Sequence, residues 1–340
     1  MRPRLHRSDP LVCPRHNRRT FLVLLTALAA LAALLTSCNG MTLVSTRTRR
    51  HDADKPTPVD VTKFAPGACV RYPPLVGDRH TTVFLDAGHG GIDPGAIGVT
   101  ETGATIEEAN ETLPVELDTM ALLRVKGFTV VVSRTRASTV VRLSSADVSG
   151  DLLTLQGAFN DVAVRDVCAN MAKAAVLVGI YFNFGSSPSN AGSLTAYDAN
   201  RPFAKANLRL ATLMQSDTLA AMNAKGWGIP DEGTLPDTGL GSLVPTDSTG
   251  GLATAAANYD HLLLLGPAEA GYFSTPSDMP GALIEPLFAT DPFEGSIVVS
   301  SIGQQTIAQG IATAIEQYFT PAPSSSSALR SRRRTSSPSS

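Results

Sequence analysis

The sequence has few histidines, few cysteines and no surplus of positive charge. Its 340 residues include six histidines and four cysteines, and 28 Lys and Arg residues stand against 30 Asp and Glu residues, for a net charge of −2. Proteins that bind nucleic acids are usually basic, so this charge argues against a nucleic-acid partner. A hydrophobic share of 43% and a charged share of 17% suit one globular domain with extensions at its ends.

The apolar run near the N-terminus, residues 21–35, is short for a membrane span, which usually needs about 20 apolar residues. Three arginines precede it within residues 15–19, and small residues lead to Cys38 after it. This order predicts a secretory signal over residues 1–38. Leu35-Thr36-Ser37-Cys38 also resembles a bacterial lipoprotein box, which implies an exported protein anchored through a lipidated Cys38 on the outer face of the cytoplasmic membrane. A plain signal peptide is the alternative.

Cysteine is scarce enough for its pairing to be considered residue by residue. Cys13 would leave with the signal and Cys38 would carry the lipid, which leaves Cys69 and Cys168 in an oxidising compartment. Two thiols in such a compartment commonly pair. We expect a Cys69–Cys168 disulfide, which would close a loop of about 100 residues and stabilise the fold by up to several kcal/mol. Two separate buried thiols are the alternative.

Composition divides the rest of the chain into a tether, one domain and a tail. Residues 39–68 are polar and interrupted by prolines, which predicts a flexible tether. Residues 321–340 are rich in serine and arginine, which predicts a disordered tail. Between them, residues 69–320 show no internal repeat and form the single expected domain, which we expect to be a monomer.

Within this domain, short β-branched runs alternate with segments of helical character. The alternation predicts an α/β fold, a single domain with a mixed, mostly parallel sheet and helices on both faces. Residues 226–252 are rich in Gly, Pro and Thr, which predicts a long loop. The expected strands are 81–88, 129–134, 174–182 and 281–288, and the expected helices are 107–126, 160–173, 208–224 and 302–319.

Three of the expected strands carry polar residues at or near their ends, where α/β sheets gather their ligands. His89 follows the first strand, Tyr181 and Asn183 lie at the end of the third, and Glu285 interrupts an apolar strand. A carboxylate in an apolar strand is expensive to bury unless it is paired or functional. Glu285 is therefore a candidate for chemistry, with an ion pair to an arginine as the alternative.

Taken together, several segments of the domain resemble the zinc-dependent N-acetylmuramoyl-L-alanine amidases, a family that cleaves cell-wall peptidoglycan. The resemblance covers residues 81–319 and is strongest in the first segment. The segments that carry it are FLDAGHGGIDPGAIG (84–98), KGFTVVVSRT (126–135), RDVCAN (165–170), WGIPDEGTLPD (227–237) and IGQQTIAQGIATAIEQYF (302–319).

The resemblance implies a zinc site, a general base and cleavage of the amide between N-acetylmuramic acid and L-alanine in peptidoglycan. Matched positions make His89 and Glu108 zinc ligands, with Glu107 as a close competitor of Glu108. Glu285 matches the base that takes a proton from the zinc-bound water. The family's other histidine ligand falls at Tyr181, where the chain reads Gly-Ile-Tyr-Phe-Asn and the family usually reads Ser-Ile-His-x-Asn. Tyrosine can bind a metal as phenolate, although its reference pKa is about 10.

Other ligands and other functions stay open. His261 is the histidine of the domain that could replace the missing ligand, because His80 should lie at the far end of the strand that leads to His89. Without zinc, the chain would be an inactive amidase-like lipoprotein that binds peptidoglycan, or a scaffolding lipoprotein that keeps the fold alone. The retained His89 motif and Glu285 favour the amidase.

Overall fold

The computed structural model describes residues 55–240 and 251–320. The predicted signal over residues 1–38, its lipidated Cys38 and the predicted tail over residues 321–340 lie outside the described residues. Within them, no helix combines the length and the apolar character that crossing a membrane requires.

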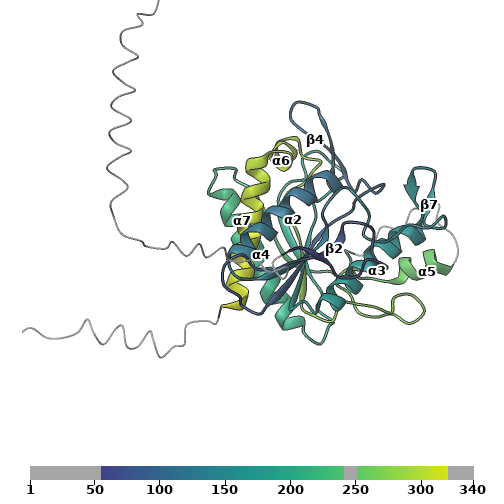
Figure 1. The fold of residues 1–340 in the computed structure, drawn as a ribbon. Helices are drawn as coiled ribbons and strands as arrows, with labels where there is room; N and C mark the ends of the chain where they lie inside the picture. The colour runs from purple at the N-terminus through teal and green to yellow at the C-terminus, as the bar shows by residue number, and fades with distance from the viewer. Residues whose placement is uncertain (1–54, 241–250, 321–340) are drawn as a thin grey trace, which may run out of the picture. The chain divides into compact units, whose positions relative to one another are not determined.

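An eight-stranded sheet forms the centre of the domain (Figure 1). In spatial order its strands are β1 (Thr57–Pro58), β2 (Ala68–Tyr72), β6 (Thr129–Arg134), β3 (Thr82–Ala87), β9 (Val176–Ile180), β12 (Gly281–Glu285), β10 (Ser193–Tyr197) and β11 (Asp231–Pro236). Strands β6, β3, β9 and β12 are parallel to one another. β10 then runs antiparallel to β12, with β11 parallel to β10, and antiparallel pairing adds β2 and β1 at the other edge.

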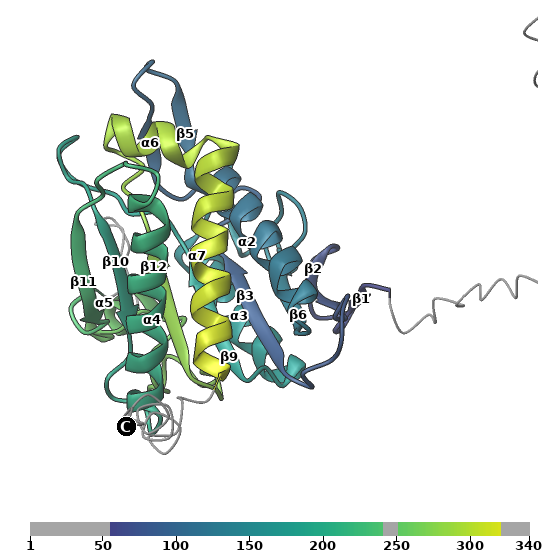
Figure 2. The ribbon, with the colours of Figure 1, turned by 90° about the vertical axis from the view of Figure 1, so that its left-hand side faces the viewer.

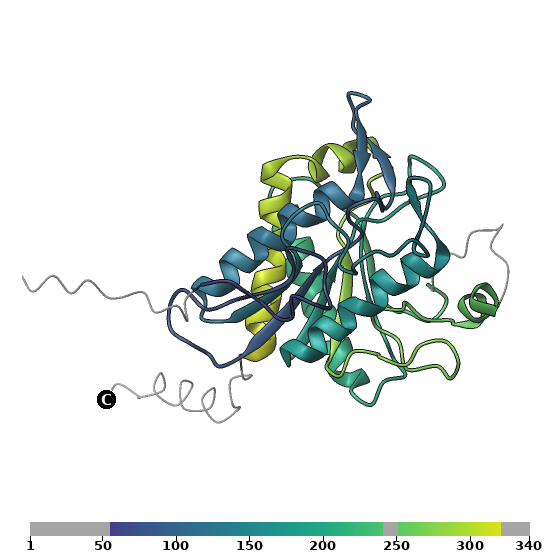
Figure 3. The same ribbon diagram turned by 45° about the vertical axis from the view of Figure 1, so that its right-hand side comes forward.

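Side chains that alternate along the buried strands give the sheet two apolar faces. Val83 and Leu85 of β3 join the core on one face, whereas Phe84 joins the core on the other. Three helices cover the first face, and α3 covers the second (Figures 2 and 3). The predicted fold class is therefore confirmed. The helices of the first face are α2 (Glu108–Val125), α4 (Ala204–Asn223) and α7 (Ser301–Phe319), and α3 spans Leu155–Ala172.

Two helix starts follow from hydroxyl side chains in the sequence. The Thr154 hydroxyl accepts a hydrogen bond from the N–H of Gly157 at the start of α3, and Ser300 caps α7 in the same way. The helix α2 continues through Pro114. The smaller elements are the hairpins β4 (Ile97–Val99) with β5 (Thr105–Glu107) and β7 (Val148–Ser149) with β8 (Leu152–Leu153), and the helices α5 (Gly251–Asn258) and α6 (Pro292–Val298).

The domain begins before residue 69, the boundary expected from composition. β1 pairs with β2, and Phe64 is 1% exposed and forms a bridge with Val141. Proline is compatible with an edge strand because its missing N–H does not interrupt an inner ladder. The tether prediction is therefore wrong for residues 55–68, and residues 39–54 lie outside the described residues.

The expected loop over residues 226–252 contains the edge strand β11, and α5 begins at Gly251. The segment Asp231–Pro236 lacks the alternation of a half-buried strand, because most of its side chains are exposed at the sheet edge. Residues 241–250 lie outside the described residues.

The predicted disulfide between Cys69 and Cys168 is confirmed, with the two Cα atoms 5.8 Å apart. Cys69 lies in β2 and Cys168 in α3, and both are fully buried. The bond therefore ties an outer strand of the sheet to the helix that covers its second face.

Replacing Cys69 and Cys168 by alanine should lower the free energy of unfolding by about 2–5 kcal/mol, because the bond restricts the unfolded chain. The two cysteines are 99 residues apart in the sequence. Guanidinium unfolding of the oxidised protein, the reduced protein and the double variant measures the difference. The reduced protein and the double variant should agree, and equal stability of the oxidised and reduced proteins would contradict the prediction.

Candidate active site

The residues singled out from the sequence meet at one edge of the sheet. β3, β9 and β12 are parallel neighbours, so the residues at their carboxyl ends share an edge. His89 follows β3, Tyr181 follows β9, and Glu285 ends β12. Glu108 begins α2. These four side chains line a cleft of about 430 Å³.

His89 is held between two carboxylates. Its Nδ1 lies 2.8 Å from Asp93 Oδ2, and its Nε2 lies 3.2 Å from Glu108 Oε2. Burial lowers the pKa of His89, but the negative charge of Glu108 and the hydrogen bond to Asp93 outweigh it and raise the pKa to about 10. Asp93 therefore fixes the ring so that Nε2 faces Glu108.

The close approach of His89 to Glu108 depends on a glycine at position 95. A Cβ there would lie 2.6 Å from His89 Cδ2 and 2.7 Å from Glu108 Oε2. Gly95 also has a φ of 68°, which side chains rarely allow. His89 itself has a φ of 58°, and this left-handed residue turns the chain directly after the strand.

Glu108, rather than Glu107, faces His89. The Glu108 side chain is buried, and its carboxylate accepts hydrogen bonds from the N–H groups of Ala96 and Phe182, each at 2.8 Å. Glu107 is exposed, and its carboxylate accepts a hydrogen bond from the Asn110 side chain. Two backbone donors thus fix the Glu108 carboxylate in place.

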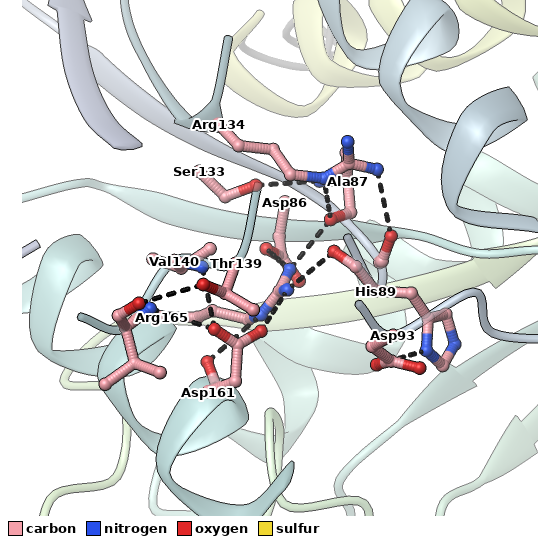
Figure 4. Close-up of polar contacts among 12 residues, drawn as sticks. Asp86, Ala87, His89, Asp93, Ser133, Arg134, Thr139, Val140, Asp161 and Arg165 are labelled. Atoms are coloured by element: carbon pink, nitrogen blue, oxygen red, sulfur yellow. Dashed lines mark hydrogen bonds and ion pairs between the residues drawn. The ribbon is translucent and has the colours of Figure 1, made fainter. Parts of the chain in front are cut away.

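A buried guanidinium supports the loop that carries His89 (Figure 4). Arg165 Nη1 lies 2.6 Å from Asp86 Oδ1, and its Nη2 lies 2.7 Å from Asp161 Oδ2. The same guanidinium donates to the backbone carbonyls of Ala87 and His89. One side chain of α3 thereby holds both the end of β3 and the residue that follows it.

Tyr181 directs its hydroxyl to Asp86. The hydroxyl donates to Asp86 Oδ2 at 3.1 Å, and the ring stands edge-on to His89 with the centroids 5.4 Å apart. Burial, followed by the negative charge of Asp86, raises the pKa of Tyr181 well above its usual value of 10. The phenol therefore keeps its proton in this arrangement, and its role as a metal ligand stays a prediction.

Glu285 has the properties of a proton acceptor near neutral pH. Burial, followed by the charge of Glu108, raises its pKa to about 7, although His89 acts in the opposite direction. A carboxyl group with a pKa near the working pH can both take up and release a proton. Within the described part of the chain, no arginine forms an ion pair with Glu285, so the structural alternative is not supported.

Asn183 and His261 have partners of their own. Asn183 Oδ1 accepts a hydrogen bond from the N–H of Phe184 at 2.7 Å, a local turn contact. His261 Nδ1 lies 3.1 Å from Asp198 Oδ2 and 3.2 Å from Asp237 Oδ1. Asp198 follows β10, whose direction is opposite to that of β12, so this group lies at the other edge of the sheet. The alternative that His261 replaces the missing ligand is therefore not supported by the structure.

The supporting residues were not found from the sequence. Asp93 contacts His89 across a loop whose path depends on several glycines, and Asp86 meets Tyr181 because β3 and β9 are paired in register. Only the pair Asp161 and Arg165 had a visible signal, the i,i+4 spacing of a helix.

Comparisons with known proteins agree with this geometry. A family model described as N-acetylmuramoyl-L-alanine amidase matches residues 83–317. The N-acetylmuramoyl-L-alanine amidase AmiC of Neisseria meningitidis serogroup B is 25% identical over 247 residues, which cover 71% of this chain and 53% of that protein. The chain thus spans about half the length of this curated relative.

The solved structure of an amidase shares the fold. The CwlD amidase from Clostridioides difficile, solved in complex with the GerS lipoprotein, is 20% identical, with a TM-score of 0.51 over 70% of this chain and 98% of that chain. The amidase AmiC2 of Nostoc punctiforme is 21% identical, with a TM-score of 0.47 over 71% and 98% of the two chains. Because the family model covers most of the chain, the chain belongs to the N-acetylmuramoyl-L-alanine amidase family.

Replacing Gly95 by alanine should push His89 away from Glu108, because the new Cβ would overlap both side chains. Without the nearby carboxylate, the pKa of His89 should fall from about 10 towards its ordinary value of 6.5. An NMR titration of the His89 ring protons in the metal-free protein measures this change.

Gly103→Ala is the matched control, because Gly103 has a φ of 81° and no described atom lies within 4 Å of its added Cβ. Both variants should lose about 1–2 kcal/mol of stability from the strain of a side chain at positive φ. The His89 pKa should change in Gly95→Ala alone, and the same pKa in both variants would show that Gly95 does not set the contact.

Proposed function

We propose that the chain is a cell-wall hydrolase that cleaves the amide bond between N-acetylmuramic acid and L-alanine in peptidoglycan. The observation that carries the proposal is the convergence of His89, Glu108 and Glu285 on one cleft. Membership of the amidase family supports the choice of bond. The relative AmiC, although longer than the matched region, bears the name of the same activity.

Two of the three expected ligands suit a zinc ion. Donor atoms around zinc with bonds of about 2.0–2.1 Å lie about 2.8–3.4 Å apart. His89 Nε2 and Glu108 Oε2 are 3.2 Å apart, within this range. Asp93 on the other ring nitrogen is the outer partner that metal-binding histidines commonly have. His89 and Glu108 would therefore hold the ion, and Tyr181 would become a third ligand only if its hydroxyl left Asp86.

The residues of the cleft then divide the work of amide hydrolysis. A bound zinc ion would lower the pKa of a water molecule and polarise the scissile carbonyl. Glu285 accepts the proton of the attacking water and returns it to the amine of the departing L-alanine. Asp93 and Arg165 hold the His89 ring and its backbone in position.

Apolar side chains form part of the lining of the cleft, which is open to solvent. Phe184, Leu240 and Leu262 are among the residues that line the cleft, and Phe184 is 59% exposed. An open cleft suits a polymer such as peptidoglycan, since both ends of the substrate must extend beyond it.

The proposed setting is the outer face of the cytoplasmic membrane. The predicted signal and lipidated Cys38 support export and anchoring, and the Cys69–Cys168 disulfide suits an oxidising compartment.

A second function is favoured by one contact. The hydrogen bond from the Tyr181 hydroxyl to Asp86 leaves the cleft with two of its three expected metal ligands. Zinc with two protein ligands would be held more weakly than zinc with three. If the ion is not retained, the chain would bind peptidoglycan through the same cleft without cleaving it.

Replacing Glu285 by glutamine should lower turnover about 10²–10⁴-fold, because the amide cannot accept a proton. Zinc content should stay unchanged, since the ligands remain. Release of new L-alanine amino groups from purified peptidoglycan measures turnover, and elemental analysis measures zinc.

Glu294→Gln is the control for the loss of a buried carboxyl group. The pKa of Glu294 is also raised to about 7, by burial first, but its carboxylate accepts from the N–H groups of Gly192 and Phe288 and does not line the cleft. Turnover should survive this change. Unchanged turnover in Glu285→Gln, or an equal loss in both variants, would remove Glu285 from its proposed role.

Two variants at Tyr181 separate the two functions. Tyr181→His should restore a third ligand and raise zinc affinity and turnover, whereas Tyr181→Phe should leave the zinc content as it is. A loss of zinc in Tyr181→Phe would show that the phenol itself is a ligand. Peptidoglycan binding without turnover in the wild-type chain, together with turnover in Tyr181→His, would favour the second function.

A further inference from the structure

We infer that Asp198, Asp237 and His261 form a second cation site, distinct from the cleft and suited to a first-row divalent metal such as zinc or manganese. The two aspartates directly follow β10 and β11, which are parallel neighbours. Their carboxylates therefore reach the same edge of the sheet, where His261 meets them from the segment after α5.

Two of the three separations between the donor atoms already fit a metal site. His261 Nδ1 lies 3.1 Å from Asp198 Oδ2 and 3.2 Å from Asp237 Oδ1, and all three atoms lie within 4.8 Å of one another. The two measured separations fall within the range of about 2.8–3.4 Å expected around a metal with bonds of about 2.0–2.1 Å.

Each carboxylate is oriented by backbone groups through its other oxygen. Asp198 Oδ1 accepts from the N–H groups of Asn200 and Arg201, at 2.5 and 2.8 Å. Asp237 Oδ2 accepts from the N–H of Leu262 at 3.2 Å. The remaining oxygens, Asp198 Oδ2 and Asp237 Oδ1, are the ones that face the imidazole. The site is therefore built before any ligand arrives.

One of these two oxygens lacks a hydrogen-bond donor. Asp198 is fully buried, and its Oδ2 accepts no hydrogen bond from any described residue. The single proton that His261 Nδ1 can carry is directed at Asp237 Oδ1. A buried carboxylate oxygen without a donor is unfavourable, and a cation between the three groups would satisfy it.

The charge around the site also favours a bound cation. Two fully buried carboxylates face one imidazole, whose side chain is 13% exposed. The nearby guanidinium of Arg201 donates hydrogen bonds to the carbonyls of Leu265, Gly266 and Ser277. A dication would neutralise the carboxylates that Arg201 does not reach.

The donor set favours a transition metal over calcium. Calcium prefers six to eight oxygen ligands, whereas one imidazole and two carboxylates suit zinc or manganese. His261 Nε2 lies 3.4 Å from the Asn200 side-chain nitrogen. If the Asn200 amide turned its oxygen to Nε2–H, Nδ1 would carry the lone pair that a metal requires.

The ion would act on the active-site cleft through Leu262. Asp237 holds the N–H of Leu262, and Leu262 lines the cleft that contains Glu285. A cation on Asp237 and His261 would therefore fix one apolar wall while leaving the His89 side untouched. This role is structural and does not rest on the proposed hydrolysis.

The test is the metal stoichiometry of the full mature chain, dialysed against chelator and titrated with zinc, manganese or calcium alone. Wild-type protein should bind two zinc ions, and His89→Ala and Asp198→Asn should each bind one. In Asp198→Asn the amide oxygen can still accept from the two loop N–H groups, so the fold should survive. Affinity at the second site should fall at least 10–100-fold, the loss seen even for outer partners of metal ligands.

His261→Gln is the second variant, because His261 lies at the partly exposed side of the group. The double variant that combines Asp198→Asn with His89→Ala should bind no zinc. Cobalt spectra of His89→Ala should show bands that His261→Gln removes. Zinc binding to wild type that neither Asp198→Asn nor His261→Gln changes would overturn the inference. The inference would also be overturned if zinc did not bind His89→Ala and if His261 were instead a protonated partner of both aspartates in the metal-free protein. Loss of the cleft's zinc alone, in contrast, would leave the second site in place and count against the proposed hydrolase only.

Discussion

The position of the candidate active site depends on one buried guanidinium. Arg165 satisfies Asp86 and Asp161 and also holds the carbonyls of Ala87 and His89. A buried charge of this kind is tolerated because every donor finds an oxygen, and removal of any partner would leave an unpaired charge in the core. The left-handed turn at His89 therefore rests on a side chain from α3, a helix on the far face of the sheet from α2 and its Glu108.

Asp86 connects this support to Tyr181, where the resemblance implies a histidine ligand. One of its oxygens is bound by Arg165, and the other accepts the Tyr181 hydroxyl. Tyr181 thus extends a structural network instead of facing His89 with a donor atom. A Cβ at Gly88 would lie 2.5 Å from the Tyr181 ring, so the glycine before His89 leaves the room that this larger side chain occupies. The Tyr181 ring therefore packs directly against the backbone before His89.

The inner sheet and the main helices could be predicted from the sequence, because Val83 to Leu85 and the matching strands alternate between two buried faces. His89 and Glu285 could be found because each stood out in its segment. The edge strands β1 and β11, and the strand β10 beside β11, could not be predicted, since exposed or mixed side chains give no clear period. Asp93 as the partner of His89, and the group around His261, could not be predicted either. They depend on a loop path and on the reversal of direction between β12 and β10, which local patterns do not encode.

The Cys69–Cys168 disulfide affects when the fold reaches its full rigidity. Cys168 lies three residues after Arg165, less than one turn along α3, so the covalent bond to β2 holds the helix that supplies the key guanidinium. Thiols stay reduced in the cytosol and pair outside it. A chain that is exported as proposed would therefore cross the membrane without this bond and gain its full rigidity only on the far side, which separates the time of synthesis from the time at which the cleft is firmly assembled.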